Sequence, residues 1–248
     1  MRLANKVCIV TGAAQGFGEG IARLFVAEGA KVVVADMNGE KAEQVAATLG
    51  DNAIACSVDV SNGEQFQAMV ERCLTAFGDL DVIVNNAGTT HRNQPMLDVD
   101  EATFDRVFAV NVKSIYHSAQ ACVPVFRKRG GGCIINIAST AGIRPRPGLV
   151  WYNSSKGAVI TMTKAMAIEL ATDQIRVNAL CPVAGETPLL KDFMGQDTPE
   201  MRAKFVASVP LGRLSTPEDI AKAALHFASD DAEFLTGVCL EVDGGRCI

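Results

Sequence analysis

The chain has 248 residues, of which 48% are hydrophobic and 21% are charged, and its formal net charge is −5. This length and composition predict one large α/β domain, or two small ones, with a full apolar core. The acidic balance argues against a nucleic-acid partner, which requires a basic surface.

No apolar run approaches the roughly 20 residues of a membrane span. The apolar stretch after Lys6 is too short for the core of a signal peptide. The eight cysteines are scattered without a C-x-x-C pair, and the three histidines lack metal-ligand spacing. We therefore expect a cytoplasmic protein with reduced thiols, no metal and no membrane partner.

Short apolar runs rich in β-branched residues alternate with longer helical patterns along the chain. Near-continuous apolar runs are typical of strands buried on both faces of a sheet. In chain order, the predicted strands are Val7–Thr11, Lys31–Asp36, Ala53–Val58, Val82–Asn85, Cys133–Ala138, Arg176–Leu180 and Val238–Val242. The predicted helices between them are Gly18–Glu28, Glu40–Leu49, Gly63–Phe77, Asp105–Arg129, Tyr152–Thr172 and Pro217–Phe227.

Strict alternation of strands and helices predicts a doubly wound parallel sheet with helices on both faces. Because the alternation never breaks, we expect a single Rossmann-like α/β domain of about seven strands over residues 1–248. No strand is predicted from Pro182 to Pro210, a stretch that follows the carboxyl end of a strand. Ligands bind at that edge, so we interpret residues from about 183 to 210 as a substrate flap. A passive packed excursion is the alternative.

The first strand ends in a glycine-rich turn that opens the first helix, with the sequence T-G-A-A-Q-G-F-G at residues 11–18. Glycines at such a turn let backbone N–H groups approach a pyrophosphate, and the helix N-terminus favours its negative charge. An ordinary tight turn is the competing interpretation of the glycines alone. We expect the dinucleotide contacts here to come from Gly12, Gln15, Gly16, Phe17 and Gly18.

The second strand ends at Asp36, which Met37 follows. A carboxylate here can accept hydrogen bonds from both ribose hydroxyls of adenosine, and it repels a 2′-phosphate. Neither the next residues nor the glycine turn contain an arginine or lysine that would offset this charge. We therefore predict NAD rather than NADP as the cofactor. The alternative is that Asp36 merely caps the following turn.

Ser139, Tyr152 and Lys156 form a second candidate site. A tyrosine and a lysine four residues apart share one face of a helix. An ammonium beside a phenol is expected to lower the pKa of the phenol from about 10, which gives a proton donor and acceptor near neutral pH. Ser139 could hydrogen-bond the oxygen that is protonated. Most such pairs are only a helix face, so this pair gains its weight from the rest of the chain.

With these residues the chain resembles the short-chain dehydrogenases/reductases over essentially its whole length. The shared motifs are T-G-x-x-x-G-x-G at Thr11–Gly18, Asp59-Val60, N-N-A-G at Asn85–Gly88, Asn111, and S-x12-Y-x-x-x-K at Ser139–Lys156. The resemblance implies hydride transfer between NAD(H) and a secondary alcohol or ketone, such as a polyol, sugar or hydroxy acid.

The resemblance also implies a role for each motif residue. Tyr152 would be the acid in reduction and the base in oxidation, and Ser139 would hold the substrate oxygen. Lys156 would lower the pKa of Tyr152 and hold the nicotinamide ribose, and Asn111 would position a water for a proton relay. The remaining motif residues would contact the adenosine of the cofactor: Asp59, Val60, Asn86, Ala87 and Gly88.

One motif departs from the family pattern. The family has P-G-x-x-x-T after the sixth strand, with the threonine on the nicotinamide carboxamide. Here Pro182 and Thr187 are in register, but Val183 replaces the glycine and Gly185 follows two positions later. A β-branched residue resists a positive φ, so the backbone is either unstrained or rearranged around Gly185.

Two other functions stay open. An NADPH-dependent 3-oxoacyl-acyl-carrier-protein reductase is disfavoured by Asp36 and by the shortage of basic residues suited to an acidic carrier. Only one group of basic residues suggests such a docking site: Arg127, Lys128, Arg144 and Arg146. A non-catalytic dinucleotide sensor or scaffold would have no need of the catalytic set.

Three segments are expected to form the substrate pocket, namely 89–93, 140–151 and the flap. Its polar or aromatic candidates are His91, Arg92, Arg144, Arg146 and Trp151. The family commonly pairs its two long helices, so a homo-oligomer, a dimer or a tetramer, is expected. The tail around Arg246 would then reach a neighbour's active site.

Overall fold

Seven parallel strands form one sheet in the computed structural model, which describes residues 1–248. The strand order is β3-β2-β1-β4-β5-β6-β7, so the predicted doubly wound parallel sheet is confirmed. The strands lie within about two residues of their predicted bounds: β1 Val7–Thr11, β2 Lys31–Asp36, β3 Ala53–Ser57, β4 Val82–Asn85, β5 Gly132–Ile137, β6 Ile175–Pro182 and β7 Cys239–Val242.

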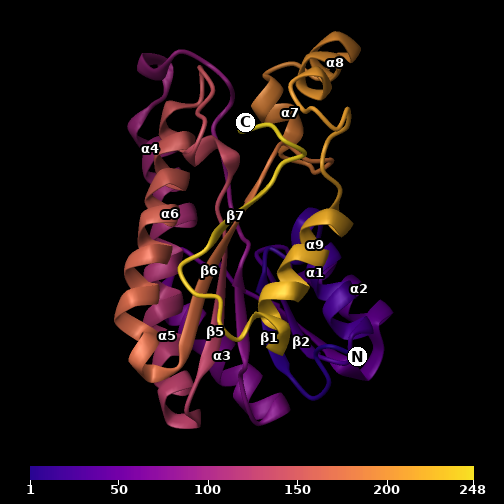
Figure 1. Cartoon of the computed structure of the whole chain (residues 1–248), viewed down its shortest axis with the longest axis vertical. Coiled ribbons are helices and arrows are strands. Elements are labelled where there is room, and N and C mark those ends of the chain that lie inside the picture. The colour runs from indigo at the N-terminus through magenta and orange to yellow at the C-terminus, as the bar shows by residue number, and fades with distance from the viewer.

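Helices cover both faces of the sheet (Figure 1). One face packs against α1 (Gly16–Ala27), α2 (Gly39–Leu49) and α9 (Pro217–Ala228) through a cluster of 27 buried residues. The other packs against α3 (Gly63–Phe77), α5 (Ser114–Arg129) and α6 (Val150–Leu170) through a cluster of 21. Two buried apolar layers therefore fix the sheet from both sides. None of the helices combines the length and apolar composition that a membrane crossing requires.

The predicted helix Asp105–Arg129 is wrong in its start and its regularity. α4 begins at Glu101, where the Asp100 side chain caps it by accepting a hydrogen bond from the Thr103 N–H at 2.7 Å. A π-helical turn at Ala109–Lys113 then joins α4 (Glu101–Phe108) to α5. Such turns widen the backbone ladder locally and often mark functional sites. Here the turn carries Asn111.

The stretch after β6 contains no strand, as predicted, but it does contain two short helices, α7 (Leu190–Met194) and α8 (Pro199–Ala207). Both lie at the end of the molecule where the C-terminus also lies (Figure 1). They pack on a separate cluster of four buried residues: Leu190, Met194, Phe205 and Leu214. This segment therefore has an apolar core of its own.

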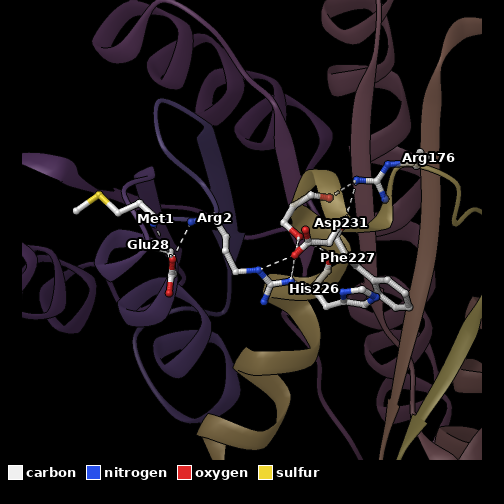
Figure 2. A network of polar contacts seen from close by, with 8 residues as sticks. Met1, Arg2, Glu28, Arg176, His226, Phe227 and Asp231 are labelled. Carbon is white, nitrogen blue, oxygen red and sulfur yellow. Dashed lines mark hydrogen bonds and ion pairs between the residues drawn. The ribbon is translucent and has the colours of Figure 1, made fainter.

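A polar network ties the N-terminal segment and β6 to the end of α9 (Figure 2). The Arg2 guanidinium donates to the Asp231 carboxylate at 2.6 Å. The backbone N–H of Arg2 donates to the Glu28 carboxylate at 2.8 Å. Arg176, on β6, donates to the Phe227 carbonyl at 2.8 Å. The network lies at the amino ends of the strands and leaves their carboxyl ends free for a site.

Candidate active site

A cavity of about 710 Å³ runs along the carboxyl ends of the strands. It crosses the boundary between β1 and β4, where the chain leaves the sheet in opposite directions and ligands bind in doubly wound folds. Fifteen of the predicted site residues line it: Gly12, Gln15, Gly16, Phe17, Asp36, Met37, Asp59, Val60, Asn86, Ala87, Gly88, Ser139, Tyr152, Lys156 and Thr187. Gly18 and Asn111 do not line it, and each lies directly behind residues that do.

The glycine turn is locked to the end of β4. The Asn86 amide donates to the carbonyls of Thr11 at 2.8 Å and Gly12 at 3.0 Å. A Cβ on Gly18 would collide with the Gly12 carbonyl and the Asn86 amide, so Gly18 permits this close approach from behind. Because the α1 N-cap residue, Gln15, makes no side-chain cap, the first N–H groups of the helix are left for a ligand.

Asp36 both caps the local backbone and lines the cavity. Its carboxylate accepts hydrogen bonds from the N–H groups of Ala14 at 3.0 Å and Asn38 at 2.9 Å. The carboxylate is thereby held between the glycine turn and the start of α2. Met37 beside it is 70% exposed and offers an apolar surface at the cavity edge. Asp59, on the next strand end, accepts from the Ser61 N–H at 2.9 Å.

Helix α6 places Tyr152 and Lys156 on one face, both buried in the cavity wall. The Lys156 ammonium donates to the Ile137 carbonyl at 2.7 Å and lies 5.9 Å from the centre of the Tyr152 ring. Burial lowers the pKa of Lys156 to about 8, and Cys181 opposes this shift. Near neutral pH the lysine is therefore a cation close to losing its proton.

The expected lowering of the Tyr152 pKa is wrong for this structure. Burial raises the pKa of Tyr152 to about 12, and Ser139 acts in the opposite direction. The ammonium of Lys156 points to a carbonyl rather than at the phenol, so desolvation of the phenolate outweighs the neighbouring charge. Tyr152 is a neutral phenol, and the Ser139 hydroxyl accepts a hydrogen bond from the Ala141 N–H at 3.0 Å.

Asn111 holds the segment that follows β4. Its amide oxygen accepts from the Thr89 N–H at 2.8 Å, and its amide nitrogen donates to the Thr89 carbonyl at 2.9 Å and the Ser155 hydroxyl at 3.0 Å. The side chain thus joins the π-helical turn to α6 one residue before Lys156. A water held for a proton relay stays a prediction.

Val183, which stands where the family has a glycine after β6, has an unstrained backbone. Val183 is buried and is not among the residues with a left-handed φ. The close approach occurs at Gly185, where a Cβ would collide with the Phe17 ring and lie 2.7 Å from the Ser215 hydroxyl. Thr187 stands over the glycine turn, 3.4 Å from where a Gly16 Cβ would be. Gly185 and Thr187 are therefore fixed against the glycine turn.

The far end of the cavity differs in part from the predicted substrate pocket. Arg144 and Arg146 line it, but three other candidates, His91, Arg92 and Trp151, do not. His91 is buried with its Nδ1 2.9 Å from the Arg92 carbonyl, and the Arg92 guanidinium donates to Gly195 at 3.2 Å. The Trp151 ring N–H donates to the Met96 carbonyl at 3.3 Å. Each of the three side chains therefore contacts a backbone carbonyl outside the cavity wall.

Two lining side chains were not singled out from the sequence: Arg106, which lies outside every predicted pocket segment, and Phe205, which lies within the predicted flap. Arg106 donates to the Thr89 hydroxyl at 3.1 Å. Phe205 lies on α8, whose start is marked by Thr198 as N-cap before Pro199. That capping pattern could have located the helix, although it could not have shown which side chain enters the cavity.

The site's parts fit one class of ligand. Uncapped helix N–H groups at a glycine turn suit a pyrophosphate, Asp36 suits a ribose, and a buried Tyr-Lys pair at the other end suits proton transfer. All line the same cavity. The fold and site define an oxidoreductase that uses a nicotinamide dinucleotide.

Comparisons with known proteins agree. A family model described as enoyl-(acyl carrier protein) reductase matches residues 12–246. The 4-formylbenzenesulfonate dehydrogenase of Comamonas testosteroni is 51% identical over 252 residues, covering 100% of both chains. Galactitol 2-dehydrogenase of Agrobacterium fabrum is 39% identical, covering 99% of both. A crystal structure of 3-ketoacyl-(acyl-carrier-protein) reductase from Brucella melitensis complexed with NADH is 47% identical with a TM-score of 0.94, covering 99% of this chain and 100% of that one.

The chain therefore belongs to the short-chain dehydrogenase/reductase family. It is an oxidoreductase that acts on CH–OH and C=O groups.

Proposed function

We propose that the protein is an NAD-dependent dehydrogenase that interconverts an alcohol and a carbonyl compound, with Tyr152 as the proton donor and acceptor. The observation that carries the proposal is that one cavity is lined by Ser139, Tyr152 and Lys156 and also by Asp36. Proton transfer and selection of the dinucleotide are thereby joined in one site.

The raised pKa of Tyr152 assigns its resting state. A neutral phenol donates its proton to the substrate oxygen in the reduction direction. The Ser139 oxygen accepts from the Ala141 N–H, and its hydroxyl proton would be donated to the same substrate oxygen. A bound nicotinamide dinucleotide supplies or accepts the hydride. In oxidation the nearby Lys156 ammonium stabilises the phenolate that accepts the proton.

Asp36 supports NAD over NADP. The cationic side chains of the cavity wall are those of Arg106, Arg144, Arg146 and Lys156, and none of them comes from β2 or the turn after it. A 2′-phosphate at Asp36 would meet a fixed carboxylate with no adjacent cation. The related Brucella melitensis structure is described as complexed with NADH, which is consistent with this choice.

The second candidate function is reduction of an acyl group carried by an acyl-carrier protein. The name of the Brucella melitensis relative, 3-ketoacyl-(acyl-carrier-protein) reductase, favours it. Two of the four basic residues considered for docking a carrier, Arg127 and Lys128, lie at the end of α5, just before β5 begins. They are therefore at the amino edge of the sheet, opposite the cavity, and Arg127 pairs with Asp173 at 2.8 Å. This position favours a free small-molecule substrate.

We also propose three further features. Residues 183–210 would act as the substrate flap of a single-domain enzyme, since Thr187, Leu189, Phe193 and Phe205 line the cavity. A homo-oligomer is consistent with large apolar side chains left exposed, Ile168 at 82% and Phe234 at 99%. The free thiols of all eight cysteines suit the reducing cytoplasm.

The test is the Tyr152→Phe variant, with Tyr116→Phe as the matched control because Tyr116 is the other tyrosine of the chain and is 54% exposed. Loss of the phenol proton should lower kcat about 10²- to 10⁴-fold while NADH binding, followed by fluorescence, is retained. Full turnover in Tyr152→Phe would overturn the proposal. Turnover absent from the wild type, with NADH bound, would favour the non-catalytic sensor.

A further inference from the structure

Three arginines, Arg144, Arg146 and Arg246, gather beside the far end of the cavity. Arg144 and Arg146 line the cavity, and Arg144 donates to the Arg246 carbonyl at 2.7 Å and to an oxygen of the Ile248 terminal carboxyl group at 3.2 Å. The tail thus packs against its own chain's cavity loop. The ion pairs of the chain include none of the three with an aspartate or glutamate.

Arg146 is the most confined of the three. Its guanidinium lies 4.4 Å from the centre of the Phe205 ring, and its one protein acceptor is the Ser208 hydroxyl at 2.9 Å. Burial lowers the pKa of Arg146, and the positive charges of Arg246 and Arg144 lower it further. The Nε–H group of Arg246 is also buried without a partner.

Such an arrangement is costly in the free protein. A partly buried cation that faces other cations is destabilised unless an anion neutralises it. A guanidinium presents paired N–H donors that match a carboxylate or a sulfonate, so the missing partner is an anionic group of this kind. Its position in the cavity wall makes the substrate the natural source.

The cavity between these arginines and the reacting groups is apolar and aromatic. The Phe193 ring lies 5.0 Å from the Tyr152 ring, centre to centre, and Leu149 and Phe205 line the same cavity. Flat apolar side chains suit a flat apolar ligand body, and aromatic rings gain additional stacking there.

We propose that the substrate is an aromatic alcohol or carbonyl compound bearing a carboxylate or sulfonate away from the reacting carbon, and that Arg146 binds this anionic group with Arg144 and Arg246 beside it. The inference rests on the proposed function, because it names the substrate of the same site. A polyol or an uncharged ketone would leave Arg146 without an anionic partner.

The first test measures binding without any reaction. Calorimetry on the whole chain would compare two anions, 4-methylbenzenesulfonate and 4-methylbenzoate, with the neutral 4-methylbenzamide. We expect one or both anions to bind about 10- to 100-fold more tightly than the amide, and Arg146→Gln to remove this advantage. The two anions distinguish a sulfonate from a carboxylate substrate. Equal binding of anion and amide, or an unchanged preference in Arg146→Gln, would overturn the proposal.

The second test measures selectivity in turnover. The ratio of kcat/KM for 4-formylbenzoate to that for benzaldehyde should fall about 10- to 100-fold in Arg146→Gln and recover in part in Arg146→Lys. Arg127→Gln, which removes the same charge at the opposite edge, should leave the ratio unchanged. Equal losses for both substrates, with a lower Tm, would show that Arg146 only clamps α8. If no aldehyde is turned over but the anions still bind through Arg146, the proposed function fails and the anion site stands.

Discussion

Replacing Asp36 with asparagine should move the cofactor preference from NADH toward NADPH. The Asp36 carboxylate is held by the backbone N–H groups of Ala14 and Asn38, so it cannot swing away from a 2′-phosphate. Unit charges about 4 Å apart at an effective dielectric of about 20 repel by about 4 kcal/mol. This energy corresponds to about a thousandfold weaker binding of a dinucleotide that carries a 2′-phosphate. Asp36 is half-buried, and salt weakens the repulsion, so the assay belongs at low ionic strength.

The assay is the ratio of kcat/KM for NADH and NADPH at equal low concentrations. We expect this ratio to fall about a hundred- to a thousandfold in Asp36→Asn. The asparagine keeps one of the two backbone hydrogen bonds, so the loss of stability should be about 1 kcal/mol, measured by urea unfolding. Asp51→Asn makes the same charge change in an exposed turn and should alter neither quantity.

The reasoning fails if the wild-type protein oxidises NADPH faster than NADH. It also fails if Asp36→Asn keeps the wild-type ratio within a fewfold. In the second case the carboxylate would be a backbone cap without a part in choosing the cofactor.

Four further predictions concern Lys156, Gly185, Val183 and Asn111. The pKa of Lys156 is about 8 in the folded protein and about 10.5 in the unfolded chain, so the unfolded chain binds more protons between these pH values. The free energy of unfolding of the wild type should therefore rise by about 3 kcal/mol from pH 8 to 10.5, relative to that of Lys156→Met. Urea unfolding of both proteins measures this difference. Gly185→Ala should lower the free energy of unfolding by about 1–3 kcal/mol, because the added Cβ collides with the Phe17 ring. Gly157→Ala is the control and should not lower Tm, because its added Cβ has no neighbour nearer than 3.9 Å. Val183→Gly should bring no gain in NADH affinity by titration, since the backbone there is unstrained. Asn111→Ala leaves two backbone groups of Thr89 without their partner, so kcat should fall and urea unfolding should show a loss of about 1–3 kcal/mol.

The fold, and the gathering of the proposed cofactor-binding residues along one cavity, could be predicted because their signals are local. A strand buried on both faces is a continuous apolar run, and the glycine turn and Asp36 stand at the ends of two such runs. The parallel topology then brings these strand ends to one edge of the sheet, so short motifs distant in sequence become neighbours.

The remaining features depend on packing that no local pattern records. The spacing of Tyr152 and Lys156 shows that they share a helix face, but the depth of their burial decides the direction of the tyrosine pKa shift. The π-helical turn at 109–113 replaces a regular helix because Asn111 bonds to Thr89 and Ser155, two segments outside that helix. The sequence alone does not distinguish Arg92 from Arg146, because both are arginines in predicted loops. Only Arg146 lies in the cavity wall of the folded protein.

The flap's separate apolar cluster has a consequence for how such enzymes diversify. Leu190, Met194, Phe205 and Leu214 form a core that is distinct from the two clusters beneath the sheet. Substitutions there can reshape the substrate end without disturbing the layers that hold Gly12 and Asp36. Residues 189–214 contain all four cluster residues and exclude Gly185 and Thr187, which pack on the glycine turn. Transplanting this stretch between relatives should change substrate selectivity and leave the cofactor preference unchanged.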